Sequence, residues 1–326
     1  MRVLVIGGTR FVGRAIVDEL LARGDEATLL HRGRTPSPFA DRVEELRADR
    51  HDRAAVLATL EGRAFDGVVD VAYDGAVGTG GREITHVVDA LSGSVPRYVY
   101  ISSASVYKET RLGIREDDLR AGEPFDSDYT KNKVQAEEAV ERAHRAGQVV
   151  GTIIRPVLIY GAHNPIPRER WLWDRIVAGR PVIVPEAGTT IFHWVASTDV
   201  AWMVGESLRH SKAAGLAFNA AEAEPISHTA FVDRLAEAAG RSVEQVCVPR
   251  QKLEAAVGAE TPPRPYFGVS LDFGADFSVE IARARQAVGF TPTDPAIGWK
   301  RAFAWYDREG RNPDPDFRLE REILGR

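Results

Sequence analysis

Three side chains in the first half of the chain could carry proton chemistry at an alcohol or a ketone: Ser103, Tyr129 and Lys133. Tyr129 and Lys133 are four positions apart where a helical pattern begins that continues through 134–146, so both lie on one face. A phenol near an ammonium group has its pKa lowered toward neutrality, which suits it to general acid/base work. A Tyr-x-x-x-Lys pair alone is common on protein surfaces, but this one follows a serine at the end of an apolar strand pattern, 97–101.

A glycine-rich turn near the N-terminus indicates where a cofactor would bind. The apolar run Arg2–Ile6 is too short for a helix and predicts a buried parallel strand, and a helical pattern that runs to Leu21 follows the turn. A strand, a glycine turn and a helix form the dinucleotide-binding arrangement, in which bare backbone and a helix N-terminus face a pyrophosphate. A plain tight turn is the alternative. The predicted cofactor contacts here are Gly7, Gly8, Thr9, Arg10, Phe11, Val12 and Gly13.

Cationic side chains favour NADP as the cofactor, with NAD as the alternative. Arg10 occupies the middle glycine position of the usual turn, pointing toward the adenosine half where NADP carries its 2′-phosphate. The second predicted strand, 26–30, leads to Arg32 and Arg34, where an NAD-binding protein would place a carboxylate on the ribose hydroxyls. Solvated loop charges are the other interpretation of Arg32 and Arg34.

Strand and helix patterns alternate through the rest of the first half. The third strand pattern, 43–47, leads to Asp49, which is a candidate for the adenine amino group and equally for capping the turn. A helix pattern at 53–60, a strand at 66–72, a helix at 82–91 and the strand at 97–101 follow. Repeated βα units with short connections predict an α/β fold, a doubly wound parallel sheet with helices on both faces.

Composition limits the function classes. The chain has 326 residues, enough for one large domain or two smaller ones. A net charge of −5 argues against nucleic-acid affinity through bulk charge. The single cysteine, Cys247, excludes an intrachain disulfide and a cysteine-based metal site, and we predict no metal. Without a signal-peptide pattern or an apolar run of about eighteen residues, we expect a soluble cytoplasmic protein that contacts no membrane.

These motifs resemble the short-chain dehydrogenase/reductase superfamily, and within it the extended and atypical NAD(P)-dependent epimerase/dehydratase group. The likeness covers nearly the whole chain. It implies a Rossmann domain over residues 1–162, with return segments at about 188–222, and a smaller α/β substrate domain over 163–326. The matching segments are Gly7–Gly13, Ser103, Tyr129–Lys133, Arg155–Gly161, Phe192–Ala201, Phe218–Ala220 and Ala287–Pro292.

The resemblance also implies roles. Tyr129 would be the acid/base, Lys133 would lower its pKa and hold the nicotinamide ribose, and Ser103 would hydrogen-bond the reacting oxygen. Hydride would move between the nicotinamide and a substrate carbinol carbon. The remaining predicted cofactor contacts are Arg32, Asp49, Arg50, Ser102, Tyr129, Lys133 and Pro156.

Three departures from the family pattern limit which relatives and which reaction types the chain resembles. Arg10 in place of glycine is similar to a subgroup with a G-G-x-x-x-x-G turn, which includes poorly defined sugar-enzyme relatives and chloroplast RNA-binding proteins. No asparagine precedes Asn132, so the upstream asparagine of many relatives is missing. Ala104 and Ser105 stand where sugar 4,6-dehydratases place Asp-Glu, which argues against a dehydratase of that type.

The region after residue 162 is less regular. It begins an insertion that would cover the active-site cleft and, as in nucleotide-sugar relatives, could grip a diphosphate through Arg168, Arg170 and Arg175. A solvated helix face is the alternative for these arginines. Trp171 and Trp173 are expected in the core rather than as ligand platforms. The polar segment 312–316 is expected to wrap the surface.

Three functions remain open. The first is an NAD(P)-dependent oxidoreductase or epimerase on a sugar nucleotide or similar hydroxylated metabolite. The second is a secondary-metabolism ketoreductase on a non-sugar substrate, and the third is an RNA-binding or regulatory protein with a vestigial cofactor fold. The Ser-Tyr-Lys set and the acidic charge weigh against the third. We expect a small-molecule substrate, no nucleic-acid partner, and a homodimer formed by the helix at 82–91 and the one carrying Tyr129, with a monomer as the alternative.

Overall fold

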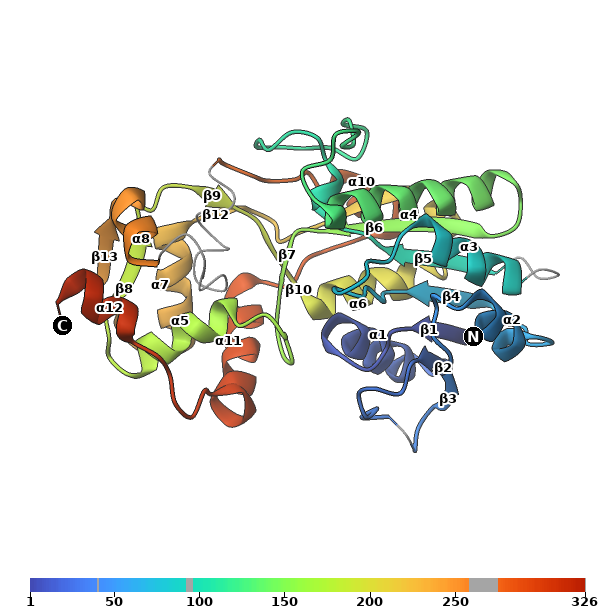
Figure 1. The fold of residues 1–326 in the computed structure, drawn as a ribbon, viewed down its shortest axis with the longest axis horizontal. Coiled ribbons are helices and arrows are strands. Elements are labelled where there is room, and N and C mark those ends of the chain that lie inside the picture. Colours follow the sequence, from blue (N-terminus) through green and yellow to red (C-terminus); the bar gives the residue numbers. More distant parts are fainter. Residues whose placement is uncertain (40, 92–95, 258–274, 326) are drawn as a thin grey trace.

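A seven-stranded parallel sheet organises the larger of two lobes (Figure 1). The computed structural model describes residues 1–39, 41–91, 96–257 and 275–325. The strand order is β11-β6-β5-β4-β1-β2-β3, which confirms the predicted doubly wound sheet. The strands are β1 (Arg2–Ile6), β2 (Glu26–His31), β3 (Glu44–Arg47), β4 (Gly67–Asp70), β5 (Arg97–Ile101), β6 (Val150–Pro156) and β11 (Ala217–Ala220).

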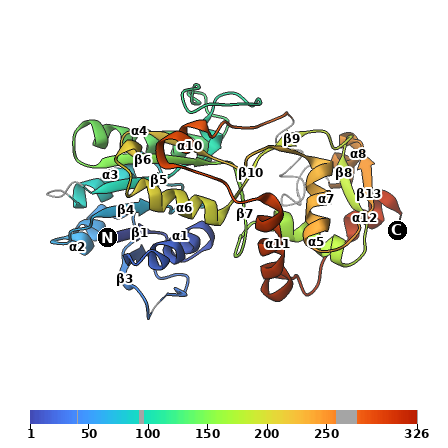
Figure 2. The same ribbon diagram turned by 180° about the vertical axis from the view of Figure 1, so that it is seen from behind.

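Helices cover both faces of this sheet because alternate strand residues point to opposite sides. Val3 and Val5 belong to a core shared with α1 (Phe11–Ala22), α6 (Ser197–Ser207) and α10 (Ala282–Val288). Figure 2 shows α1 and α6 side by side on this face. Leu4 and Ile6 face the other core, with α2 (Arg53–Leu60), α3 (Gly81–Ala90) and α4 (Asp128–Arg145).

The helix predicted to carry Tyr129 is α4, which begins at Asp128. The Ser127 hydroxyl accepts a hydrogen bond from the backbone N–H of Thr130 at 3.1 Å, which caps the first turn of α4. Tyr129 and Lys133 are therefore both helical. The short helix η1 (Ala104–Val106) follows β5, and Ser103 is the residue that caps its first turn.

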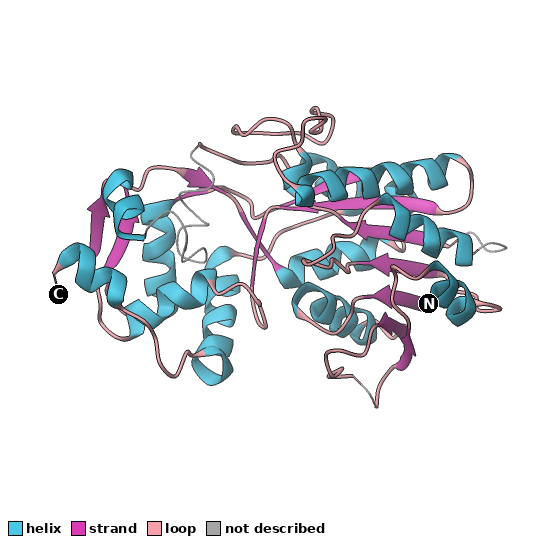
Figure 3. Ribbon diagram, in the orientation of Figure 1, coloured by secondary structure: helices cyan, strands magenta, loops and turns pink. Residues whose placement is uncertain are grey.

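The smaller lobe is mainly helical (Figure 3). It holds a parallel pair of strands, β8 (Val182–Pro185) and β13 (Gln245–Val248), around an aromatic core. Trp173 is 1% exposed in that core, which confirms its predicted place, and Trp171 is half-buried against it. Among the described residues, its helices are α5 (Arg168–Val177), α7 (His228–Ala238), α8 (Arg250–Val257), α11 (Pro295–Trp305), the π-helical turn η3 (Tyr306–Gly310) and α12 (Arg318–Leu324).

The chain passes between the lobes several times. β7 (Leu158–Tyr160) pairs in parallel with β10 (Trp194–Ala196), and β9 (Ile191–Phe192) pairs with β12 (Ile226–Ser227). The chain then returns to the large sheet through α6, the short helix η2 (Ser211–Ala213) and β11. It returns once more through α10, which packs on α6 and β11 and which the predicted boundaries did not separate from the second domain. Residues 258–274 and 326 of that domain lie outside the described residues.

No helix in the described part of the chain is both long and apolar enough to cross a membrane. The segment 312–316 is largely exposed and connects η3 to α12.

Candidate active site

A cleft of about 500 Å³ lies at the carboxyl ends of β1, β4 and β5. Open α/β sheets bind ligands at this edge. We call one end of the cleft the tyrosine end, lined by Ser102, Tyr129 and Lys133, and the other the arginine end, lined by Arg10, Arg32 and Arg34. Residues 159, 165 and 166, from the connection between the lobes, also line the cleft.

The glycine turn forms part of the cleft wall, and two of its glycines have no room for a side chain. A Cβ on Gly13 would lie 2.2 Å from the Gly7 carbonyl oxygen, and one on Gly7, whose φ is +94°, would lie 2.8 Å from the Cβ of Ala72. Gly8 instead packs toward the core, where an added Cβ would meet Leu29. The turn residues that line the cleft are Gly7, Thr9, Arg10, Phe11, Val12 and Gly13.

Bare backbone at the start of α1 fits the pyrophosphate of a dinucleotide. The first helical N–H groups have no partner within a helix, and the helix dipole is positive at this end. Because Gly7 and Gly13 add no side chains at the two ends of the turn, these groups are open to a phosphate. The residues present therefore fit a nicotinamide dinucleotide, with Arg10 at the head of the helix.

The structure brings Ser103, Tyr129 and Lys133 together, as the sequence predicted. The Lys133 ammonium is 4% exposed and donates a hydrogen bond to the Ile101 carbonyl oxygen at 2.8 Å. Its nitrogen lies 5.8 Å from the centre of the Tyr129 ring. The Ser103 side chain lies near enough to the Tyr129 hydroxyl to lower its pKa, and the Ser103 hydroxyl accepts from the Ser105 backbone N–H at 3.1 Å. A serine and a tyrosine hydroxyl thus meet beside a fixed cation.

The predicted lowering of the Tyr129 pKa by Lys133 is wrong for the chain by itself. Although 38% of the residue is exposed, burial around the hydroxyl raises the pKa of Tyr129, and the hydrogen bond from Ser103 only partly opposes this. Burial also lowers the pKa of Lys133 to about 8. A low phenol pKa would therefore need a further positive charge, such as that of an oxidised nicotinamide.

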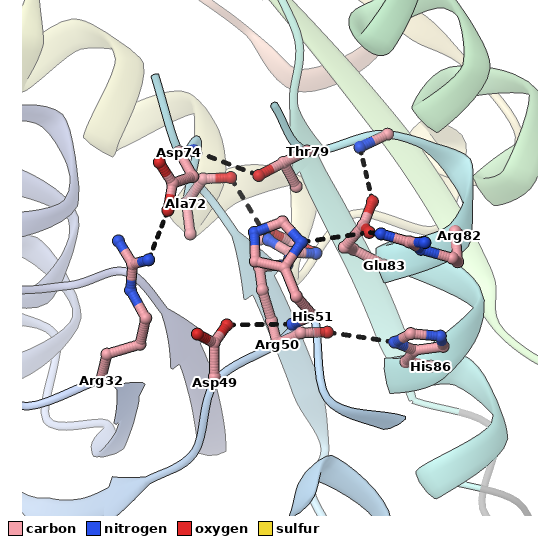
Figure 4. A network of polar contacts seen from close by, with 12 residues as sticks. Arg32, Asp49, Arg50, His51, Ala72, Asp74, Thr79, Arg82, Glu83 and His86 are labelled. Atoms are coloured by element: carbon pink, nitrogen blue, oxygen red, sulfur yellow. Dashed lines mark hydrogen bonds and ion pairs between the residues drawn. The ribbon is translucent and has the colours of Figure 1, made fainter. Parts of the chain in front are cut away.

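Arg50 was predicted to contact the cofactor, but its guanidinium forms a buried ion pair within the protein. It donates to the two Asp70 oxygens at 2.6 and 2.7 Å and to the Ala72 carbonyl oxygen at 3.2 Å. The Tyr98 hydroxyl donates to the same carboxylate at 2.7 Å. Burial lowers the pKa of Arg50, but Asp70 more than compensates, so the pKa is raised overall. Arg50 lines the cleft while its charge joins the ends of β3 and β4 (Figure 4).

Two other predicted cofactor contacts lie away from the cleft lining. The Asp49 carboxylate accepts from the His51 backbone N–H at 3.1 Å, which is the turn-capping role that the sequence left open. Pro156 is buried at the end of β6, in register with Ala220 of β11. Ser102 is 4% exposed and does line the cleft.

The arginine end contains a carboxylate that sequence reasoning missed. Arg10 and Arg32 both line the cleft, as predicted, but Arg32 forms an ion pair with Asp74, in the loop after β4 (Figure 4). The preceding residue, Tyr73, packs edge-on against Tyr129 with ring centres 4.9 Å apart. Both residues follow the carboxyl end of a central strand, and that position is the signal that could have identified them.

The three arginines of the insertion do not act as one group. Arg175 is 1% exposed and donates to the Glu320 carboxylate at 2.7 Å, with its guanidinium stacked on Trp171. Neither the diphosphate grip nor the solvated face predicted for Arg175 is correct. Arg170 lies 5.9 Å from the ring centre of Trp305. Only Arg168 influences the tyrosine end, where its charge lowers the pKa of Tyr129.

A buried ion pair fixes α4 to the sheet one helical turn beyond Lys133. Glu137 is fully buried and accepts from Arg155 at 2.9 and 2.7 Å and from Arg120 at 2.9 Å. Burial raises the pKa of Glu137, but the arginine bonds outweigh it and the pKa is lowered overall. Sequence reasoning assigned no role to this glutamate, which anchors the helix that carries the tyrosine end.

A family model described as the NAD dependent epimerase/dehydratase family matches residues 3–221. The chain belongs to this family. The predicted membership of the epimerase/dehydratase family is thereby confirmed.

Two curated relatives illustrate the range of the family. The chain is 30% identical over 253 residues to the "Chloroplast stem-loop binding protein of 41 kDa b" of Arabidopsis thaliana, covering 73% of this chain and 63% of that protein. It is 31% identical over 175 residues to the dTDP-6-deoxy-L-talose 4-dehydrogenase (NAD(P)(+)) of Kitasatospora kifunensis, covering 50% and 54%. The matches thus span less than two thirds of either relative.

Solved structures share the fold. The UDP-glucuronic acid 4-epimerase of Bacillus cereus in complex with NAD superposes with a TM-score of 0.73 at 17% identity, over 94% of this chain and 99% of that one. The UDP-glucose 4-epimerase of Thermotoga maritima gives a TM-score of 0.77 at 15% identity, with the same coverage. At these identities the likeness establishes the architecture alone.

Proposed function

We propose that the chain is an NAD(P)-dependent oxidoreductase, of the reductase or epimerase type, acting at a carbinol or carbonyl carbon of a hydroxylated metabolite. The observation that carries this proposal is that Tyr129 and Lys133, with Ser103 beside the phenol, lie at one end of a cleft that the glycine turn helps to line. The family supports the same reaction class.

The bound cofactor would supply the hydride chemistry. Tyr129 would give or take a proton at the substrate oxygen, and Ser103 would hold that oxygen within hydrogen-bonding reach. Lys133, fixed by the Ile101 carbonyl oxygen, would place a positive charge beside the phenol and the nicotinamide ribose. Because the phenol pKa is raised in the chain alone, Tyr129 would serve as a proton donor until a cationic cofactor binds.

We propose NADP as the preferred cofactor, with NAD as the alternative. Arg10 and Arg32 support this preference, because both line the arginine end of the cleft and the end of β2 offers no carboxylate to ribose hydroxyls. An arginine can bind a phosphate through two charge-assisted hydrogen bonds.

A sugar nucleotide is the first candidate substrate. The dehydrogenase relative, whose printed name includes a dTDP-sugar, supports it, as does the charge of Arg168 near Tyr129. A ketoreductase acting on a non-sugar substrate is the second candidate. It is favoured by the core position of Arg175, which removes one cation from a diphosphate grip, and by the apolar residues Ile159 and Ile166 of the cleft wall.

Nucleic-acid binding is supported only by the name of the Arabidopsis relative, and the net charge of −5 weighs against it. We also propose a homodimer formed through α3 and α4, which pack against each other along the sheet. Light scattering at micromolar concentration should give twice the chain mass, and a monomer mass would reject the dimer.

Calorimetric titration of the full chain with NADPH and with NADH tests the proposed function first. We expect both to bind and NADPH to bind more tightly. A panel of keto-sugars and simple ketones, followed by NADPH oxidation, then identifies the substrate class. Failure of both dinucleotides to bind would contradict the proposed function.

A further inference from the structure

The Arg32 guanidinium at the arginine end is already paired, and its partner comes from a different strand. Arg32 follows β2, whereas Asp74 follows β4, so the sheet brings the two loops together at the cleft (Figure 4). We propose that Asp74 is a specificity-determining residue, which sets the preference between cofactors with and without a 2′-phosphate by competing for Arg32. This inference rests on the proposed function, because it concerns the same nucleotide cleft.

The two oxygens of the Asp74 carboxylate have different partners. Oδ1 accepts from the Ala76 backbone N–H at 2.9 Å, and Oδ2 accepts from Arg32. The Asp74 backbone is held as well: its N–H donates to the Thr79 hydroxyl at 3.1 Å, and its carbonyl oxygen accepts from the Gly78 N–H at 2.8 Å. The carboxylate is therefore set in a closed turn, and its negative charge cannot easily swing away from the cleft.

Arg32 is the more exposed partner and the one that a ligand could turn. Its side chain is 31% exposed, against 12% for the Asp74 side chain. A 2′-phosphate at this end would have to take the guanidinium from a carboxylate that stays in place, and would also feel the repulsion of that carboxylate. A cofactor with a free 2′-hydroxyl would leave the ion pair intact. Asp74 thus disfavours the binding of a 2′-phosphate in two ways, and neither of them affects a cofactor that lacks this phosphate.

Arg10 differs from Arg32 in its ion pairing. It lines the same end of the cleft, it is exposed, and among the described residues none forms an ion pair or a side-chain hydrogen bond with it. A phosphate could bind Arg10 without displacing any of these residues. Of the two predicted phosphate-binding arginines, Arg10 is open and Arg32 is paired with Asp74. The Asp74 carboxylate therefore reduces a preference for NADP that would be stronger if Arg10 acted without it.

The direct test is the Asp74→Asn variant of the full chain. Asparagine keeps an oxygen that can accept from the Ala76 N–H, so the turn is preserved while the negative charge that faces Arg32 is removed. Dissociation constants for NADP⁺ and NAD⁺ are measured by calorimetry at one fixed salt concentration. We expect NADP⁺ to bind about tenfold more tightly than to the wild type, with NAD⁺ changed by less than about twofold.

Two further variants identify the mechanism. In an Arg32→Met background, Asp74→Asn should improve NADP⁺ binding by only about threefold or less, because the competition for the guanidinium is gone and only the repulsion remains. Asp89→Asn is the matched control, since Asp89 forms an exposed ion pair with Arg53 at 3.1 Å and neither residue lines the cleft. It should leave both affinities unchanged.

Several outcomes of these measurements would contradict the proposed role of Asp74. If Asp74→Asn alters the ratio of the two dissociation constants by less than about twofold while both cofactors still bind, the Arg32–Asp74 pair is an inert surface contact and the inference fails, with the proposed function intact. Equal tightening of both cofactors, or the same gain in Asp89→Asn, would also overturn it. A wild type that binds neither dinucleotide would overturn the proposed function and this inference together.

Discussion

The two ends of the cleft are built in opposite ways. At the tyrosine end, Lys133 is buried, hydrogen-bonded to the end of β5 and carried by a helix that Glu137 anchors to the sheet. At the arginine end, Arg10 and Arg32 are exposed and lie in turns. Proton transfer requires groups held within fractions of an ångström, whereas binding an anion tolerates mobile charges. Under the proposed function, the groups for proton transfer are held by rigid elements, whereas the arginines proposed to select the cofactor lie in loops.

The largest expected effect is at the rigid end. Lys133→Met removes the ammonium proposed to serve both the phenol and the nicotinamide ribose, so both turnover and cofactor binding should weaken. We expect turnover to fall by about two to four orders of magnitude. Steady-state kinetics and calorimetry with the same dinucleotide measure the two effects. A methionine variant with wild-type values for both would remove Lys133 from the site.

Glu137, which anchors the helix of the tyrosine end, should contribute to the stability of the fold. Glu137→Gln leaves the buried Arg155 guanidinium without its counter-charge and should lower the free energy of unfolding by about 3–5 kcal/mol. Glu141→Gln is the matched control on the same helix, because Glu141 pairs with Arg120 while its side chain is 31% exposed, and it should cost about 0–1 kcal/mol. Urea denaturation compares the two variants, and equal losses would show that Glu137 is not an anchor.

At the arginine end the expected effects are smaller and specific to the phosphate. Replacing Arg10 and Arg32 together by methionine should weaken NADP(H) binding by about 1–3 kcal/mol, with little loss for NAD(H). Arg10→Met alone should cost more than Arg32→Met, because Arg32 is shared with Asp74. Fluorescence titration with NADPH and NADH measures this. If the wild type binds NADH as tightly as NADPH, the assignment to NADP is wrong.

The smallest expected effect is the pH dependence of cofactor binding, which should arise at the tyrosine end. Burial holds the pKa of Lys133 at about 8, below its ordinary 10.5, so the folded chain loses this charge as the pH rises through about 8. Dinucleotide affinity should decrease there, and Lys133→Met should lack the step. The stability effect has the opposite sign: between about 8 and 10.5 the unfolded chain binds the extra proton, so raising the pH favours folding. Calorimetry from pH 7 to 9 showing constant wild-type affinity would contradict the placement of Lys133.

Short-range patterns made much of the larger lobe predictable. The strand at Arg2–Ile6, the bare turn that ends at Gly13, and the helix that carries Tyr129 and Lys133 all follow from residues that are neighbours in the sequence. These features are determined locally, by apolar periodicity, glycine and capping residues. The same patterns predicted the parallel sheet, because repeated βα units leave few other topologies.

Long-range pairing made the rest unpredictable. Nothing near Arg175 in the sequence indicates that it meets Glu320, and nothing near Arg32 indicates Asp74, because the sheet and the lobe packing decide both pairs. The pKa of Tyr129 in the chain without cofactor was predicted in the wrong direction for a related reason. The sequence shows the lysine four residues away, but it does not show how far burial disfavours a charged phenolate.

The central claim is that the tyrosine end performs proton transfer, and Tyr129→Phe tests it most directly. Phenylalanine keeps the ring and its packing on Tyr73 but removes the transferable proton. Wild type and variant are compared on the same ketone panel by NADPH oxidation, with cofactor affinity measured alongside. The predicted result is unchanged NADPH binding with turnover reduced by about two to four orders of magnitude. An active wild type whose Tyr129→Phe variant turns over equally fast would contradict the account.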